Sequence, residues 1–259
     1  MTPWHSLAGK TIWITGGAGH LGSPVTAALD AAGAKVICFD LSDRAAALVQ
    51  SRGLTRTLAR SLDVTAVDTL PAAIDAVISE HGVPDGVVHL PTASSRGRTV
   101  ENMPLDEFRR TFDHALTPTF VLCRTLAKHM KPRGHGAFVL FASMYGVVAP
   151  DPRIYRSTLT PNPIDYGTAK AAIIQMTRYL AVHYGPAGLR FNCVTPGPFP
   201  NPAIQTGDPA FIAELAKKNP LGRIGQPEEM VGPVLFLLGD GASYVTGHSL
   251  VVDGGWTIW

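Results

Sequence analysis

The amino-acid sequence predicts an α/β fold with a doubly wound parallel sheet, built as one domain over residues 1–259. Short apolar runs alternate along the chain with longer segments of helical periodicity, which is typical of parallel strands joined by helices. No tandem repeat, low-complexity tract or hinge-like linker divides the chain. With 259 residues, of which 46% are hydrophobic, the chain is long enough to bury a sizeable core.

The expected elements follow this alternation. We predict buried strands at residues 11–15, 35–40, 86–90, 137–142, 189–195 and 249–252. We predict helices at residues 21–32, 67–81, 104–130, 164–184 and 228–238. Two proline-rich stretches, 150–163 and 196–209, are predicted to be long loops. Because each follows a strand, both should border the crevice outside the carboxyl ends of the strands.

The composition argues against several classes of function. The 22 Lys and Arg residues nearly match the 20 Asp and Glu residues without forming a basic stripe, so neither nucleic acid nor a membrane is an expected partner. The apolar run 234–238 is too short to span a bilayer, and residues 1–10 lack the pattern of a secretory signal. Cys38, Cys123 and Cys193 have no metal-binding spacing, so we expect reduced thiols, a cytoplasmic protein and no metal site.

A glycine-rich turn directly follows the first predicted strand. Gly16, Gly19, His20 and Leu21 lie in the segment 15–22, which opens a predicted helix. Glycine lets backbone N–H groups approach a pyrophosphate at the helix N-terminus, whereas a Cβ atom would block the approach. We therefore predict a dinucleotide site here, with an ordinary strand–helix turn as the alternative.

Asp40 ends the second predicted strand. A carboxylate at this place can accept hydrogen bonds from both ribose hydroxyls of adenosine and repels a 2′-phosphate, so we predict NAD rather than NADP as the cofactor. Arg44, one turn further on, is expected to be a solvated helix residue, with softening of this repulsion as the alternative. Asp63 and Val64, which precede the predicted helix 67–81, are predicted to meet the adenine ring, with a helix cap as the alternative for Asp63.

Tyr166 and Lys170 are four residues apart on a predicted helix, which places a phenol beside an ammonium group. A neighbouring cation favours the phenolate and lowers the pKa of a tyrosine toward a value useful for general acid–base catalysis. Taken alone, this spacing also fits an ordinary pair on a helix surface. The pair gains significance from its position downstream of the glycine-rich turn and Asp40.

Taken in order, these features resemble the short-chain dehydrogenase/reductase family over nearly the whole chain. The matching residues are 15–22, Asp40, 63–64, Ser143, Tyr166, Lys170, 192–197, 223–228 and 252–256. The resemblance implies a Rossmann-type single domain and hydride transfer to or from a nicotinamide. It also implies a homodimer or homotetramer built on two long helices, here 111–130 and 169–184.

The resemblance implies a role for each matching residue. Tyr166 would be the general acid–base, Lys170 would lower its pKa and bind the nicotinamide ribose, and Ser143 would hydrogen-bond the substrate oxygen. Pro196 and Gly197 would face the nicotinamide carboxamide. The segment that follows them, as far as residue 220, would form a lid over the substrate.

Three positions depart from the common form of the family. His20 stands where a glycine is usual, and residues 89–93 read His-Leu-Pro-Thr-Ala in place of Asn-Asn-Ala-Gly. Ala115 aligns with a helix asparagine that the family uses in a proton relay to the lysine. The adjacent His114 points about 100° away on a helix, so its taking over this role is only a guess.

The loop between Ser143 and Tyr166 has 22 residues, about twice the length that is common in the family. It resembles the corresponding loop of members associated with polysaccharide biosynthesis or flagellin-sugar modification. Arg153, Tyr155 and Arg156 would bring cationic and hydrogen-bonding groups to the crevice, where arginine suits a carboxylate or phosphate. The alternative for both arginines is an ordinary surface charge.

The sequence therefore predicts an NAD(H)-dependent oxidoreductase that interconverts an alcohol and a carbonyl on a small polar, sugar-like substrate. Three alternatives remain. Ala115 suggests a catalytically weakened dinucleotide-binding regulatory or scaffold protein, and the spacing of glycines in 16–22 suggests a sugar-nucleotide epimerase. The segment 219–229 also suits a 3-oxoacyl-thioester reductase. The apolar end, 256–259, is expected at a subunit interface.

Overall fold

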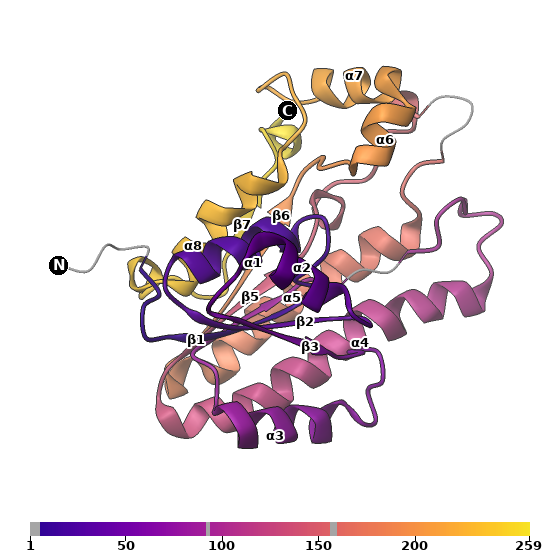
Figure 1. The fold of residues 1–259 in the computed structure, drawn as a ribbon. Coiled ribbons are helices and arrows are strands. Elements are labelled where there is room, and N and C mark those ends of the chain that lie inside the picture. Colours follow the sequence, from indigo (N-terminus) through magenta and orange to yellow (C-terminus); the bar gives the residue numbers. More distant parts are fainter. Residues whose placement is uncertain (1–5, 92–93, 156–159) are drawn as a thin grey trace.

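A seven-stranded parallel sheet forms the centre of the molecule in the computed structural model, which describes residues 6–91, 94–155 and 160–259 (Figure 1). The strand order is β3-β2-β1-β4-β5-β6-β7. The strands are β1 Thr11–Thr15, β2 Lys35–Asp40, β3 Thr57–Ser61, β4 Gly86–His89, β5 Gly136–Phe141, β6 Leu189–Pro196 and β7 Ser249–Val252. The predicted doubly wound, Rossmann-type sheet is confirmed.

Helices cover both faces of the sheet, as Figure 1 shows. They are α1 Gly22–Ala31, α2 Arg44–Arg52, α3 Leu70–His81, α4 Leu105–Met130, α5 Ile164–Tyr184, α6 Pro202–Gly207, α7 Pro209–Lys217 and α8 Val231–Leu238. Helices α3, α4 and α5 pack on one face, and α1, α2 and α8 pack on the other. Because both faces are covered, the central strands are apolar throughout rather than alternating.

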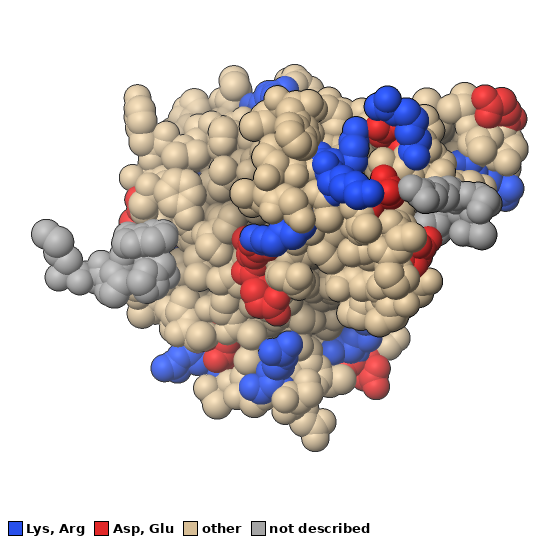
Figure 2. Space-filling model, turned by 90° about the horizontal axis from the view of Figure 1, so that it is seen from above, with Lys and Arg blue, Asp and Glu red and all other residues tan. Residues whose placement is uncertain are grey.

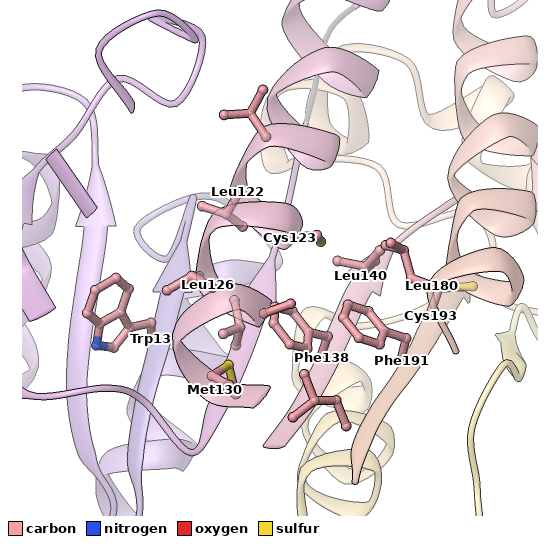
Figure 3. Close-up of a cluster of buried hydrophobic side chains, with 14 of the residues drawn as sticks. Trp13, Leu122, Cys123, Leu126, Met130, Phe138, Leu140, Leu180, Phe191 and Cys193 are labelled. Atoms are coloured by element: carbon pink, nitrogen blue, oxygen red, sulfur yellow. The ribbon is translucent and has the colours of Figure 1, made fainter. Parts of the chain in front are cut away.

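Alternate residues of each strand enter the two cores. In β2, Ile37 and Phe39 belong to the core under α3, α4 and α5, while Val36 and Cys38 belong to the core under α1, α2 and α8. Figure 3 shows part of the first core, where the side chains of α4 and α5 meet the central strands. These cores fix the carboxyl ends of the strands, where the chain reverses its winding between β1 and β4.

The predicted loop 196–209 contains helical structure that the sequence analysis misses. Helices α6 and α7 each begin with a proline, and the residue before each one caps the helix. The Asn201 side chain accepts a hydrogen bond from the Ile204 N–H, and the Asp208 side chain accepts one from the Phe211 N–H. The two Asx-Pro pairs carry this signal, since Asn or Asp at the N-cap followed by proline favours a helix start.

The C-terminal segment also differs from the prediction. Trp256 is buried within its own chain, in a cluster with Met144, Ile154 and Leu215. Trp259 is exposed, although its indole N–H donates to the Lys218 carbonyl at 2.9 Å. The expectation that the whole segment is buried at a subunit interface is therefore wrong for Trp256, which this chain covers itself.

Phe138 offers a test of the core packing. Its ring is fully buried and stacks on Phe191 with centroids 4.1 Å apart. Phe138→Ala should lower the free energy of unfolding by about 3–5 kcal/mol, measured by urea denaturation, because it removes the apolar contacts and leaves a cavity. Val100→Ala, at an exposed side chain, should change it by less than about 0.5 kcal/mol. Equal effects of the two substitutions would contradict the described packing.

Candidate active site

A crevice of about 460 Å³ opens at the carboxyl ends of the central strands. Its walls come from the turn after β1, the ends of β2, β4, β5 and β6, helix α5 and the start of α6. The predicted site residues that line it are Gly16, Gly19, His20, Leu21, Asp40, Ser143, Tyr166, Lys170, Pro196 and Gly197. The fold thus gathers in one cavity residues that are up to 181 positions apart in the sequence.

The turn between β1 and α1 has the geometry of an anion cradle. Gly16 has a φ of +70°, which glycine adopts without strain. A Cβ atom on Gly22 would lie 2.2 Å from the Gly16 carbonyl oxygen, so only glycine fits there. No side chain caps the N-terminus of α1, and its first turn carries no acidic residue. Its N–H groups therefore suit a pyrophosphate, and the residues fit a dinucleotide.

His20 adds a polar group to this turn. Its side chain lines the crevice, and its Nε2 atom is buried without a hydrogen-bond partner among the described residues. A buried imidazole nitrogen without a partner is costly unless a ligand or water completes it. The histidine that stands in place of the usual glycine therefore has a free polar atom in the wall where the cofactor would lie.

Asp40 and Arg44 form an ion pair at the end of the crevice beside the glycine-rich turn. The Asp40 carboxylate is buried and accepts hydrogen bonds from the Ala18 and Leu41 N–H groups, both at 2.9 Å. The Arg44 guanidinium lies 3.2 Å from the same carboxylate and also lines the crevice. Arg44 is therefore not simply a solvated helix residue, as the sequence suggests. It places a positive charge beside the carboxylate that is predicted to select NAD.

Asp63 and Val64 do not line the crevice. The Asp63 side chain accepts hydrogen bonds from the backbone and the hydroxyl of Thr65, which lower the pKa of its carboxyl group. Val64 packs against the core under α3, α4 and α5. Asp63 thus closes a local turn with Thr65 and does not cap helix α3, whose N-cap residue is Thr69, so the helix-cap alternative is wrong. The adenine contact stays a prediction.

Ser143 and Tyr166 meet because two backbone segments approach closely. A Cβ atom on Gly146 would lie 2.8 Å from the Ala171 nitrogen, so glycine allows the segment after β5 to lie against α5. The Ser143 hydroxyl lies beside Tyr166, where hydrogen bonding to the phenol oxygen acts to lower the tyrosine pKa, and it accepts a hydrogen bond from the Tyr145 N–H at 3.2 Å. The serine is thereby oriented by its own turn.

Lys170 completes the group from the next turn of α5. Its Nζ lies 5.7 Å from the centroid of the Tyr166 ring and donates to the carbonyls of Pro91 at 2.7 Å and Phe141 at 3.0 Å. Burial lowers the pKa of Lys170 to about 7. Burial also raises the pKa of Tyr166, although the Ser143 hydrogen bond and the charge of Arg96 oppose this effect. The protein alone therefore does not lower the tyrosine pKa as the sequence predicts.

His89 stands where the family pattern Asn-Asn-Ala-Gly has its first asparagine. Its fully buried side chain connects β4 to β1 and α4. Its Nδ1 lies 2.5 Å from the Thr15 hydroxyl, and its Nε2 lies 3.0 Å from the Thr119 hydroxyl. Because Thr119 donates its proton to the Ala115 carbonyl at 2.6 Å, His89 donates from Nε2 and accepts at Nδ1. Burial lowers the pKa of His89 to about 3, so the ring is neutral. This link holds the end of β4, where Leu90 and Pro91 line the crevice.

Within the part of the chain that the structure describes, neither Ala115 nor His114 replaces the relay asparagine. Ala115 is buried and contributes only its carbonyl to the His89 link. His114 is exposed, and its charge acts on Asp63 rather than on the lysine. The idea that His114 takes over the relay is therefore wrong, because its helix position turns it away from the crevice.

The long loop before α5 contributes less to the crevice than predicted. Arg153 is exposed, pairs with Asp151 at 2.9 Å and does not line the crevice, so it fits the alternative of a surface charge. Asp151 also pairs with Lys218 at 2.7 Å, which ties this loop to the end of α7. The Tyr155 hydroxyl lies 2.8 Å from the Tyr145 hydroxyl. Tyr145 in turn lies near Tyr166, so Tyr155 is connected to the predicted catalytic residues only through Tyr145. Arg156 lies outside the described residues.

Arg96, after β4, lines the crevice and was not among the predicted site residues. Phe199, Asn201 and Ile204, after β6, also line it, in the segment that was predicted to form a lid over the substrate. Each follows the carboxyl end of a central strand, where ligands bind in open α/β sheets. The position of these residues just after a strand was therefore the signal that could have identified them. Which loop residues line the crevice also depends on how each loop folds back over the sheet.

The remaining surface gives little support to other classes of ligand. Figure 2 shows basic side chains interspersed with acidic ones on the face that is seen from above. Within residues 6–91, 94–155 and 160–259, no cluster of His, Cys, Asp or Glu has the geometry of a metal site. No helix in the same ranges is both long and apolar enough to cross a bilayer.

Comparison with known proteins agrees with this geometry. A family model described as enoyl-(acyl carrier protein) reductase matches residues 17–257. The chain is 31% identical to 2,5-dichloro-2,5-cyclohexadiene-1,4-diol dehydrogenase of Sphingobium indicum over 97% of this chain and 98% of that protein. It is equally similar, over the same shares, to cis-4-hydroxycyclohexanecarboxylate dehydrogenase of Sinomonas cyclohexanicum.

Solved structures show the same fold. A short-chain dehydrogenase from Leptospira borgpetersenii with bound NAD+ has a TM-score of 0.85 and 30% identity, covering 100% of this chain and 97% of that one. A gluconate 5-dehydrogenase from Burkholderia cenocepacia in complex with NADP and tartrate has a TM-score of 0.85 and 26% identity, covering 98% and 97%. These matches extend over nearly the whole chain and include both forms of the nicotinamide cofactor. The protein therefore belongs to the short-chain dehydrogenase/reductase family and is an oxidoreductase of that family.

Proposed function

We propose that this protein is an NAD(H)-dependent oxidoreductase that interconverts an alcohol and a carbonyl on a small polar, sugar-like substrate. One observation carries the proposal. A single crevice holds Ser143, Tyr166 and Lys170 at one end and the glycine turn with Asp40 at the other. The first end fits proton transfer at an oxygen atom, and the second fits a dinucleotide. The names of the relatives specify a diol and a hydroxy acid, which supports a small oxygenated substrate.

Tyr166 is the proposed general acid–base. In oxidation its deprotonated oxygen accepts the proton of the substrate hydroxyl, and in reduction its protonated form donates to the carbonyl oxygen. The Ser143 hydroxyl, held by the Tyr145 N–H, hydrogen-bonds the same substrate oxygen and orients it. The nicotinamide cofactor, when bound, accepts or supplies the hydride.

Lys170 sets the electrostatic environment of the phenol. Two of its three N–H donors are used by the carbonyls of Pro91 and Phe141, which leaves one for the ribose or the phenol. Burial favours the neutral amine, while a deprotonated Tyr166 nearby favours the ammonium form. The protonation states of the two side chains are therefore coupled, and the pair titrates as a unit.

The proposed cofactor is NAD, on the strength of Asp40. Its buried carboxylate faces the part of the crevice next to the glycine turn, where a 2′-phosphate would meet a like charge. Arg44 opposes this preference, because its guanidinium lies in the same place and would attract a phosphate. The balance between the two charges decides the selectivity.

A second candidate is reduction of an acyl thioester. It is favoured by the description of the matching family model, which names an acyl carrier protein as the carrier of the substrate. Tyr166-dependent turnover of a 3-oxoacyl thioester that exceeds turnover of sugars and sugar acids would establish this candidate instead.

We also propose a homodimer or homotetramer, located in the cytoplasm. Phe120 on α4 and Tyr179 and Val182 on α5 expose large apolar side chains on the two long helices. Exposed apolar groups on neighbouring helices suit a subunit interface. The cytoplasmic location rests on the composition and on the buried free thiols of all three cysteines.

Tyr166→Phe tests the proposed mechanism. The change removes the hydroxyl that transfers the proton, so turnover of sugars or sugar acids with NAD, followed by NADH absorbance, should fall by about 10²-fold or more. The affinity for NADH, measured by fluorescence titration, should change by less than about threefold, since the ring remains. Tyr244→Phe, at an exposed tyrosine outside the crevice, is the matched control and should leave turnover unchanged.

Turnover preserved in Tyr166→Phe would overturn the mechanism. Turnover by the wild type that is lost in this variant excludes a purely regulatory or scaffold role. Release of free NADH during turnover argues against an epimerase that holds its cofactor.

Asp40→Ser tests the cofactor assignment. Removing the carboxylate leaves Arg44 unopposed, so the ratio of NADP+ to NAD+ affinity should rise by about tenfold or more. The ratio is the quantity to measure, because Asp40 also holds the Ala18 N–H and its loss can weaken both cofactors. Arg44→Ala should move the ratio in the opposite direction. Tighter binding of NADP+ than of NAD+ by the wild type would refute the role of Asp40.

Light scattering tests the association state. The wild type should have the mass of a dimer or tetramer, and Val182→Glu should shift it toward smaller species, because the substitution buries a charge at the proposed interface. Val100→Glu, at another exposed position, in the loop before α4, should leave the mass unchanged. A monomeric wild type would contradict the proposal.

A further inference from the structure

Arg96 occupies a loop that is fixed on both sides. The Ser95 N–H donates to the Asp165 carboxylate at 2.9 Å, and the Ser95 hydroxyl donates to the Glu107 carbonyl at 3.3 Å. Arg98 forms a bidentate pair with the Glu107 carboxylate at 2.8 and 2.5 Å. These contacts anchor the loop between β4 and α4 to the helices α4 and α5. The backbone of Arg96 is therefore held at a defined place beside the crevice.

The Arg96 side chain is not used in this anchoring. It is exposed, it lines the crevice together with Ser143, Tyr166 and Lys170, and it has no ion pair or hydrogen bond among the described residues. Arg98, two residues later, shows the contrast, since it pairs with Glu107 of α4 through two hydrogen bonds. Arg96 lines the same crevice as Tyr166, and its charge acts to lower the tyrosine pKa.

The charges that line the crevice are unequally distributed. At the end beside the glycine-rich turn, Asp40 and Arg44 neutralise each other. At the reacting end, Arg96 and Lys170 are both basic, and no acidic side chain lines the crevice there among the described residues. Asp165 precedes Tyr166 in the sequence, but its carboxylate is buried and does not line the crevice. It accepts hydrogen bonds from the Ser95 N–H and the Thr111 hydroxyl. A negatively charged substrate would balance the positive charge at this end of the crevice.

We propose that Arg96 binds a carboxylate of the substrate, so that the enzyme acts on hydroxy acids such as sugar acids rather than on neutral sugars. This inference rests on the proposed function, because it places the reacting hydroxyl at Ser143 and Tyr166. The planar guanidinium binds a carboxylate through two parallel hydrogen bonds, and one free cation matches one negative charge. The acids named in a relative and in a solved neighbour, a hydroxycyclohexanecarboxylate and a gluconate, agree with this class.

The test compares acids with neutral analogues of the same shape. Sugar acids and hydroxycyclohexanecarboxylates are paired with compounds in which a hydroxymethyl group replaces the carboxylate, and kcat/KM is measured for each with NAD. For the pair of compounds that the wild type turns over, kcat/KM should be about 100-fold higher for the acid than for its neutral analogue. Charge-assisted hydrogen bonds contribute strongly at a partly desolvated site. In Arg96→Met, kcat/KM for the acid should fall until this preference is lost, while kcat/KM for the neutral analogue should change by less than about threefold. Arg96→Lys should be intermediate, because it keeps the charge without the fork.

Arg153→Met is the matched control. It removes the arginine that the sequence suggests for substrate binding, and it should leave the ratio of acid to neutral analogue unchanged. A lost preference in Arg153→Met with an unchanged ratio in Arg96→Met would overturn the proposal. An equal fall in kcat/KM for the acid and the neutral analogue in Arg96→Met would overturn it too. So would a wild type with a higher kcat/KM for the neutral compound.

Binding gives a readout that is independent of turnover. Quenching of NADH fluorescence measures the affinity of each acid for the complex with NADH, and Arg96→Met should weaken it by about 100-fold while NADH affinity stays unchanged. If no acid binds to that complex, or if a phosphate ester binds more tightly through Arg96, the carboxylate assignment is wrong. Tyr166-dependent turnover of neutral analogues alone would leave the proposed function standing and remove only this inference.

Discussion

The buried ammonium group of Lys170 is the interaction on which the rest of the site depends. A lysine taken out of water is stable only when its donors are satisfied, and here the carbonyls of Pro91 and Phe141 do this from the ends of two different strands. The bond to Pro91 fixes the segment after β4, and the bond to Phe141 fixes the segment that leads to Ser143. One side chain of α5 thereby positions both walls of the reacting end relative to Tyr166.

This dependence explains how the site retains its shape despite two departures from the family pattern. The Lys170 contact to Pro91 requires the end of β4 to stay in register, and the neutral His89 link to Thr15 and Thr119 provides that support. Ala115 takes part only through its carbonyl, so the structure keeps the scaffold around the lysine but not the side chain of the relay. The described contacts thus preserve the position of the lysine, although the side chain at 115 offers no polar group.

The sequence predicts most of what depends on local chemistry. Gly16 and Gly22 are recognisable because a turn that approaches an anion tolerates no Cβ atom, and Tyr166 with Lys170 because helix geometry fixes their separation. The strands were located because burial on both faces leaves continuous apolar runs. Arg153 and Arg96 show where this reasoning ends. Both are arginines in loops near strand ends. Only the fold reveals that Asp151 pairs with the first, while the second lines the crevice without an ion pair to any residue that the structure describes. Such pairings depend on tertiary contacts that no local pattern contains.

The location of the charges also separates two kinds of selectivity. Asp40 and Arg44 belong to β2 and α2 and lie beside the glycine-rich turn, whereas Arg96 belongs to the loop between β4 and α4 and lies near Tyr166. Among the described residues no hydrogen bond or ion pair joins the two groups, and substitutions at sites without shared partners have nearly additive effects. Under the proposed roles, a change of cofactor preference at Asp40 and Arg44 therefore leaves the substrate preference set by Arg96 unchanged. The solved neighbours accordingly include structures with NAD+ and with NADP on the same fold.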